Sequence, residues 1–272
     1  QDCCQAAGSA AGVAANGIDT GGIPEPEVSI PNVEGNEFRY PILYLYRRQE
    51  ADSGGPGKFR GGVGLSMAFM PHDVPEISDM VIHTHGVTFP SALGLSGGHP
   101  GSLNRITIKR DTNIQALFQG GTMPGSLTQI RGQEELPPPF THTSLQAGSV
   151  VECVGGGGGG YGDPLERAPE AVAGDVVNGL VSQAAARKQY GVVLDGERGV
   201  DRDATDREHA TVRAQRQSLA RNPTQRLRPE GETGAEKLVA RINEYLTMAL
   251  GPEGPTIRCR CGLTLCAASE HY

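Results

Sequence analysis

The sequence lacks tryptophan and is poor in the other aromatic residues, with 6 Phe and 7 Tyr among 272 residues. It also lacks a surplus of positive charge, because 24 Lys and Arg stand against 31 Asp and Glu and give a formal net charge of −7. A chain this acidic is a poor candidate for binding nucleic acid through its phosphates. We therefore predict no nucleic-acid partner.

Long apolar runs are missing as well. No segment approaches the roughly 20 apolar residues that a helix needs to cross a bilayer, and no basic stretch followed by an apolar one marks a secretory signal. The six cysteines are too sparse for a disulfide scaffold. We therefore predict a cytoplasmic protein without membrane contact. Because residue 1 is Gln, we expect the numbering to begin inside a longer gene product or after processing.

Common catalytic signatures are also absent. The sequence contains no GK[ST] ending of a Walker motif and no H-E-x-x-H. Isolated motifs therefore do not identify a reaction.

Glycine and proline are abundant, with 39 and 19 residues, but the glycines have no three-residue period and so exclude collagen. A hydrophobic content of 37% is low for a compact domain and indicates a chain that is either loop-rich or partly a fragment. We predict an α+β fold. A β-rich domain with long Gly-rich loops would cover residues 1–163, a helical charged segment 164–250, and the start of a zinc-binding module 251–272.

Strand-like and helix-like patterns support this division. Short runs rich in β-branched and aromatic residues predict strands at Phe38–Tyr46, Val63–Phe69, Ser78–His83, Leu103–Ile108 and Ala147–Val154. Helical spacing and capping signals predict helices within Pro164–Leu180, from an N-cap at Ser182 to Gly191, over a charged solvated stretch 199–222, and over Gly234–Ala249. Residues 192–194 could add a further strand.

Six consecutive glycines, Gly155–Gly160, are the most unusual local feature. Residues without Cβ lose much backbone entropy on folding, so such a run indicates close approach of the backbone to another group. That group could be a phosphate, because a predicted helix follows. The structural interpretation, a close-packed or mobile loop at a subunit contact, is the one we favour.

A second glycine-rich stretch, GGPGKFRGG at Gly54–Gly62, carries Lys58 and Arg60. Backbone N–H groups and two cations could bind an anion there. A hairpin turn with solvated basic residues explains the same composition equally well.

His83 and His85 are separated by one residue. In a strand both side chains would face the same side, so both could contact one metal ion or an anionic substrate. No acidic partner is fixed nearby, and a polar, partly buried loop after a strand is the simpler interpretation.

Three cysteines lie close together near the end of the sequence, at Cys259, Cys261 and Cys266. Closed structural zinc sites need four Cys or His ligands, and His271 could be one of them. Alternatively, the missing ligands lie beyond Tyr272 or on a partner chain, or the cysteines are reduced thiols. We predict structural zinc.

Two stretches resemble the hydantoinase B/oxoprolinase (HyuB) family: SGGPGKFRGGVGL and VECVGGGGGGYGDPLERAPEAVAGDVVNGLVSQAAARKQYGVVL. PNVEGNEFRYPILYLYRRQEADSGG fits the same family, so the resemblance covers about residues 5–200 and matches the C-terminal part of such a subunit. It implies a HyuA-like partner that binds Mg-ATP. It also implies either ATP-dependent opening of a cyclic amide or ATP-dependent carboxylation of a ketone with bicarbonate, with the catalytic residues outside this chain.

The tail TIRCRCGLTLCAASEHY resembles the zinc-binding start of the small subunit of acetone carboxylases. This favours a ketone carboxylase, the acetophenone type in particular. The resemblance implies Cys259 and Cys261 as zinc ligands, with Cys266 a further position of the motif, and a small zinc subunit or the rest of a HyuB-like subunit as partners. Lys58, Arg60, His83 and His85 are the candidates for contact with substrate or anion. A cyclic amide hydrolase and a non-catalytic scaffold subunit remain the alternatives.

Overall fold

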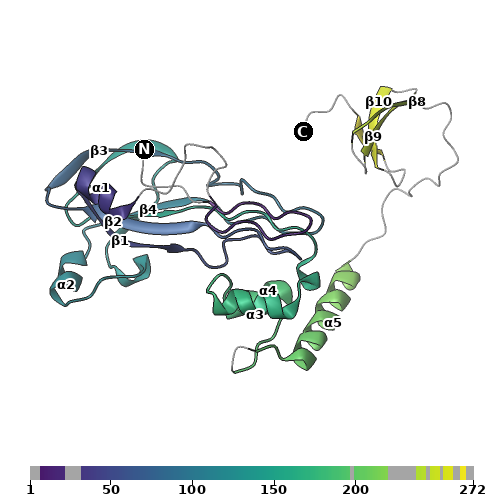
Figure 1. Cartoon of the computed structure of the whole chain (residues 1–272). Coiled ribbons are helices and arrows are strands. Elements are labelled where there is room, and N and C mark those ends of the chain that lie inside the picture. The colour runs from purple at the N-terminus through teal and green to yellow at the C-terminus, as the bar shows by residue number, and fades with distance from the viewer. Residues whose placement is uncertain are drawn as a thin grey trace. The chain divides into compact units, whose positions relative to one another are not determined.

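The computed structural model describes residues 7–21, 32–196, 199–219, 237–242, 246–251, 254–259 and 264–267 (Figure 1). Its contacts divide the chain into two units, Gln1–Ala214 and Gln215–Tyr272. No helix among the described residues has both the length and the hydropathy of a bilayer-spanning segment.

The first unit mixes helices and strands, which confirms the predicted α+β class. Its elements in chain order are α1 (Val33–Arg39), β1 (Ile42–Gln49), β2 (Leu65–Pro71), β3 (Glu76–His83), β4 (Arg105–Arg110), α2 (Ile114–Gln119), the 3-10 turn η1 (Leu127–Gln129), β5 (Gln133–Glu135), β6 (Phe140–Gln146), β7 (Val150–Val154), the 3-10 turn η2 (Pro164–Glu166), α3 (Pro169–Val177) and α4 (Gln183–Tyr190). The last helix, α5 (Arg202–Leu219), begins in this unit and extends past its boundary at Ala214.

A five-stranded antiparallel sheet in the order β1-β2-β7-β4-β5 forms the centre of this unit. One face packs against the two-stranded ribbon β3–β6 through Ile82 and Leu145. The other face packs against α2 and η1 through Ile114 and Leu127. Every residue of β2 and β7 is buried, because both faces of the central strands are covered.

Four of the five predicted strands match β2, β3, β4 and β7. The strand predicted over Phe38–Tyr46 is wrong at its start, because Phe38 and Arg39 end α1 and Tyr40 is the C-cap of that helix. Asn32 caps that helix, since its Oδ1 accepts a hydrogen bond of 3.0 Å from the Gly35 N–H. Pro41 follows the helix and cannot continue it, so the strand begins only at Ile42.

The six-glycine run packs tightly among other extended segments. Together with 8–18, 53–64 and 94–101 it forms what we call the glycine layer, in which segments run side by side beyond the sheet (Figure 1). A Cβ at Gly158 would lie 1.8 Å from the Ser9 carbonyl oxygen, and one at Gly157 1.8 Å from the Ser53 oxygen. These approaches exclude any side chain, so the run is close-packed. Its place at a subunit contact stays a prediction.

The amide groups of the run are also used inside the protein. Gly158 N–H donates to the Gly62 oxygen at 2.9 Å, and Gly160 N–H donates to the His99 oxygen at 2.9 Å. The Gly157 N–H donates to Ser102 Oγ at 3.1 Å. A phosphate cradle would need these donors to be free, so the geometry does not favour one here.

The helices after the glycine layer follow the predicted local signals. Ser182 caps α4, accepting a hydrogen bond of 3.1 Å from the Ala185 N–H, and Gly191 ends it with a φ of 66°. The predicted solvated helix is α5, in which Thr205 and His209 are buried. Residues 192–194 form no strand beyond an isolated bridge between Leu194 and Val200.

The second unit contains an antiparallel sheet in the order β11-β10-β9-β8. Its strands are β8 (Lys237–Arg241), β9 (Leu246–Gly251), β10 (Gly254–Cys259) and β11 (Thr264–Ala267).

The helix predicted over Gly234–Ala249 is wrong, because β8 and most of β9 occupy it. Leu246, Met248 and Leu250 alternate with other residues, a period of two that suits a strand. The boundary predicted at residue 250 falls inside the β9–β10 pair, where Gly251 lies opposite Gly254.

Candidate functional site

Arg60, predicted to bind an anion, is buried and engaged by carboxylates of the protein itself. Its Nη1 donates to Asp19 Oδ1 at 2.8 Å, and its Nε lies 3.4 Å from Asp175 Oδ2. Burial of Asp19 raises the pKa of its carboxyl, but hydrogen bonds from Arg60 and the Val63 N–H outweigh burial and lower that pKa. Arg167 donates to the same Asp175 oxygen at 2.7 Å. Arg60 thus ties the glycine layer to the helices.

Lys58 lies apart from Arg60, at the surface. Its side chain is 48% exposed, and its Nζ lies 3.4 Å from Glu166 Oε2. It lines a cavity of about 420 Å³ together with Asn16 and Arg167. The two cations of the GGPGKFRGG stretch therefore do not converge on one anion.

His83 and His85 come together at the end of β3, where both are exposed rather than partly buried. Their ring centroids are 4.9 Å apart, and both rings contact Phe140 of β6, at 4.6 and 5.7 Å. Across the parts of the chain with described coordinates, no group of three or more His, Cys, Asp or Glu residues could hold a metal ion. The pair is therefore an exposed aromatic cluster without a third ligand there.

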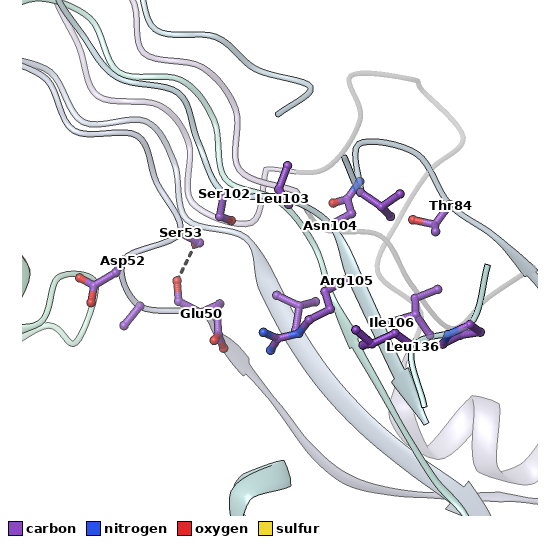
Figure 2. A pocket seen from close by; sticks show the side chains of 14 residues that line it. Glu50, Asp52, Ser53, Thr84, Ser102, Leu103, Asn104, Arg105, Ile106 and Leu136 are labelled. Atoms are coloured by element: carbon purple, nitrogen blue, oxygen red, sulfur yellow. Dashed lines mark hydrogen bonds between the residues drawn. The ribbon is translucent and has the colours of Figure 1, made fainter. Parts of the chain in front are cut away.

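A larger cavity, of about 560 Å³, opens where the sheet meets the glycine layer (Figure 2). We call it the sheet-end cavity. It is lined by Glu50–Ser53, Thr84, Val87, Ser102–Ile106, Leu136, Pro137 and Val154. Thr84 belongs to this lining, whereas the neighbouring His83 and His85 pack with Phe140. Glu50, Asp52 and Arg105 make one part polar, and the remaining lining is largely apolar.

Arg105 is held by a buried carboxylate. Glu152, in the middle of β7 and 4% exposed, accepts a hydrogen bond of 3.2 Å from Arg105 Nη2. The hydroxyl of Tyr46 donates to the other oxygen of Glu152 at 2.6 Å. Burial, and then the hydrogen bond to Glu152, raise the pKa of Tyr46 far above its ordinary value. The phenol therefore keeps its proton and remains a donor to Glu152.

Asn104 connects the cavity to two of the sequence motifs. Its Oδ1 accepts a hydrogen bond from the Gly156 N–H, and its Nδ2 donates to the His85 carbonyl oxygen at 2.6 Å. The opposite wall is fixed by Ser53, whose Oγ donates to the Glu50 oxygen at 2.6 Å and accepts from the Gly64 N–H at 2.9 Å. The glycine layer thus positions the cavity walls through backbone contacts and through the side chain of Ser53.

The predictions from sequence missed Glu50, Arg105 and Glu152. One signal was available for Glu152, because it interrupts the apolar run VVECV of a predicted strand. A carboxylate buried in such a run needs a cationic or hydrogen-bonding partner. No signal in the sequence pointed to Arg105 as that partner, since 47 residues separate the two.

The predicted zinc ligands fall in the second unit. Cys259 ends β10 and is partly buried. Cys266 lies on the paired strand β11, where it faces Ile257 in the register. Cys261 and His271 lie outside the described residues. The backbone therefore brings two of the three cysteines onto adjacent strands.

Comparison with known proteins identifies the family. The family model described as hydantoinase B/oxoprolinase matches residues 3–164. The acetone carboxylase alpha subunit of Xanthobacter autotrophicus is 31% identical over 235 residues, covering 78% of this chain and 30% of its own length. The caprolactamase subunit beta of Pseudomonas jessenii is 34% identical over 174 residues, covering 64% of this chain and 27% of its own. The acetophenone carboxylase delta subunit of Aromatoleum aromaticum is 34% identical over 191 residues, covering 65% and 27%.

Comparison with solved structures finds the same two kinds of relative, acetone carboxylase and caprolactamase. A nucleotide-free acetone carboxylase superposes with a TM-score of 0.70 at 28% identity over 80% of this chain and 31% of the other. The ATP-dependent caprolactamase of Pseudomonas jessenii gives a TM-score of 0.57 at 28% identity over 75% and 32%. This chain spans less than a third of the length of each of these relatives. Over that span, it belongs to the hydantoinase B/oxoprolinase family.

Proposed function

We propose that this chain forms part of the HyuB-like subunit of an ATP-dependent ketone carboxylase, of the acetone or acetophenone type, which fixes bicarbonate onto a ketone through phosphorylated intermediates. One observation carries the proposal. The likeness to acetone carboxylase covers 78% of this chain, against 64% for caprolactamase. The TM-scores, 0.70 and 0.57, rank the two relatives in the same order.

The sheet-end cavity is the site we assign to the organic substrate. Cavities of roughly 300–1,000 Å³ with mostly apolar walls and a few polar groups bind small organic molecules, and this one measures about 560 Å³. Mg-ATP would bind a HyuA-like partner subunit, because this sequence carries no Walker ending. The remainder of a HyuB-like subunit would complete the active site and supply catalytic groups. We place the assembly in the cytoplasm.

The second unit would carry a structural zinc ion that joins subunits. The β10–β11 pairing fits such a site, because it brings Cys259 and Cys266 onto adjacent strands. Cys261 would be a further ligand, and the fourth would come from His271 or a partner chain. Bound zinc would lock the hairpin to that partner.

Metal analysis of the purified complex tests the zinc assignment. Changing Cys259 and Cys261 to Ser should remove zinc and release subunits in size-exclusion chromatography. Cys153→Ala is the matched control, because this buried cysteine lies in β7 and its loss should leave zinc in place. Stoichiometric zinc in the double variant would refute the assignment.

The reaction is tested on the complex as purified from its source. We expect ATP consumption with acetophenone or acetone to require bicarbonate, and labelled bicarbonate to enter the organic product. ATP consumption with a ketone that proceeds equally well without bicarbonate would contradict the proposal.

Hydrolysis of a cyclic amide is the second candidate, favoured by the 34% identity to caprolactamase subunit beta. Such an enzyme would consume ATP with a lactam, hydantoin or 5-oxoproline and be indifferent to bicarbonate. The third candidate is a scaffold subunit without contact to substrate. In that case, alanine at Lys58, His83 and His85 would leave activity unchanged, and so would alanine at Arg105.

A further inference from the structure

The charges of the sheet-end cavity are unequally available to a ligand. Glu50 lies 3.8 Å from Arg48, and Asp52 accepts a hydrogen bond of 2.7 Å from the Ser182 N–H. Both acids therefore have partners within the protein. Arg105 is the only cation in the described lining of this cavity.

The guanidinium of Arg105 is both held and accessible. One nitrogen, Nη2, donates to the buried Glu152, while 56% of the side chain remains exposed. Among the residues with described coordinates, its Nε and Nη1 have no hydrogen-bond acceptor. A planar guanidinium anchored on one side presents its other N–H groups as a fork that matches a carboxylate.

Glu152 and Tyr46 determine where this fork points. Glu152 is fixed by the Tyr46 hydroxyl at 2.6 Å, so the carboxylate that anchors Arg105 cannot swing away. Neither residue lines the cavity. They are positioning residues that act on a ligand only through Arg105.

The rest of the lining is mostly apolar. Leu103, Ile106, Leu136 and Val154 belong to it, with Val87 and Pro137, and Figure 2 shows Ile106 and Leu136 close together on the same side of the view as Thr84. The cavity therefore combines one anchored cation with apolar surface.

We propose that the sheet-end cavity binds an organic carboxylate with an apolar body, with the carboxylate on Arg105 and the body against the apolar lining. For a ketone carboxylase, that ligand is the β-oxo carboxylate product. The choice of this ligand rests on the proposed function, whereas the carboxylate site itself rests on Arg105 and its surroundings.

Binding to the purified complex tests this site, with benzoylacetate and acetoacetate as probes and benzoylacetamide as the neutral analogue. Isothermal titration calorimetry should show about 10- to 100-fold weaker binding of the carboxylates to Arg105→Ala, the range expected for loss of a charged hydrogen-bonded pair. Binding of benzoylacetamide should change less than about 2-fold, because its amide gains little from the cation. Arg105→Lys should recover part of the loss.

Arg187→Ala is the matched control. Its Nη2 lies 3.3 Å from Glu208 in a comparable ion pair, but Arg187 lies outside this cavity's lining. Glu152→Gln should weaken binding of the two carboxylates and leave binding of benzoylacetamide unchanged, because it loosens the anchor of Arg105. If Glu152 had a purely structural role, Glu152→Gln would weaken binding of the carboxylates and of the amide alike.

Equal binding of benzoylacetate to the wild type and Arg105→Ala overturns the site, as does a wild-type complex that binds neither carboxylate. A complex that fixes no bicarbonate but binds carboxylates in an Arg105-dependent way refutes the proposed function and leaves the site standing. Fixation without Arg105-dependent binding refutes the site alone.

Discussion

Asn104 donates a hydrogen bond of 2.6 Å from Nδ2 to the carbonyl oxygen of His85. The same side chain accepts the N–H of Gly156. One amide group therefore joins the histidine loop, the glycine layer and the sheet-end cavity, three features that are far apart in the sequence.

Replacing Asn104 with Ala should destabilise the protein by about 1–3 kcal/mol, because the Gly156 N–H loses its acceptor in a crowded backbone environment. Urea denaturation monitored by circular dichroism measures the change. Asn178→Ala is the control: this exposed residue follows α3 and should cost less than about 0.5 kcal/mol. Equal effects of the two substitutions would mean that the connection contributes nothing.

Gly158→Ala should prevent correct packing of the glycine layer. The new Cβ would meet the Ser9 carbonyl oxygen at 1.8 Å, so the backbone must move, at a cost of more than about 3 kcal/mol. Gly174→Ala is the matched control, because nothing lies within 4 Å of a Cβ there. Within α3 it should instead stabilise the protein by about 0.5–1 kcal/mol. Thermal unfolding compares the two, and a stable Gly158→Ala protein would refute the close packing.

Asp19 should contribute stability that depends on pH. Its folded pKa lies below the ordinary value of 3.8, so this stabilisation is fully present above that value and is lost as the pH falls through the folded pKa. Asp19→Asn should destabilise at pH 7 by less than the roughly 3–5 kcal/mol of a broken buried pair, because Asp175 still faces Arg60. The difference from wild type should shrink below pH of about 4.

Denaturation at several pH values tests this expectation, with Asp206→Asn on the exposed surface of α5 as the control. A difference between Asp19→Asn and wild type that is constant down to pH 2 would contradict it.

Tyr190 should make the stability of the protein depend on pH in the alkaline range. Burial raises the pKa of its phenol to about 12, so the folded protein keeps a proton that the unfolded chain loses from pH of about 10 upward. Stability should therefore fall as the pH rises from about 10, the pKa of the unfolded chain, to about 12, the pKa of the folded protein. The hydroxyl is buried without a hydrogen-bond partner in the described structure, so Tyr190→Phe should stabilise the protein by up to about 1 kcal/mol at pH 7.

Unfolding at pH 7 and 11 measures both effects, with Tyr161→Phe as the comparison. A Tyr190→Phe protein that is less stable than wild type at pH 7 would show that the hydroxyl has a partner.

Predictions based on helix-capping signals were accurate. The Ser182 cap and the Gly191 stop define α4 in both the sequence and the structure, because capping depends on residues within one turn. The strand predicted at Phe38 was wrong for a local reason too, since the cap at Asn32 outweighs the strand propensity of the aromatic residues.

Predictions that depend on distant partners were less accurate. Arg60 and Arg105 are both arginines near glycines or strands, yet Asp19 and Asp175 engage the first, whereas Glu152 leaves the second partly exposed. Only the fold determines which carboxylate each arginine meets.

The pattern of Gly234–Ala249 was ambiguous for a different reason, because pairing with neighbouring strands decides between helix and strand in a short apolar stretch. The resemblance to the hydantoinase B/oxoprolinase family indicated a class of function, which residue periodicity alone could not do. The match of the family model over residues 3–164 confirms that resemblance.

The glycine layer has a thermodynamic consequence. Its extended segments meet through peptide hydrogen bonds such as Gly158 to Gly62 and Gly55 to Gly158, and its glycines have no side-chain hydrocarbon to bury. Unfolding such a layer exposes mainly polar backbone, which lowers the heat capacity, whereas exposing apolar surface raises it. This part of the protein therefore adds little to the curvature of stability with temperature, so the framework that holds the cavity resists cooling better than a hydrophobic core of equal size.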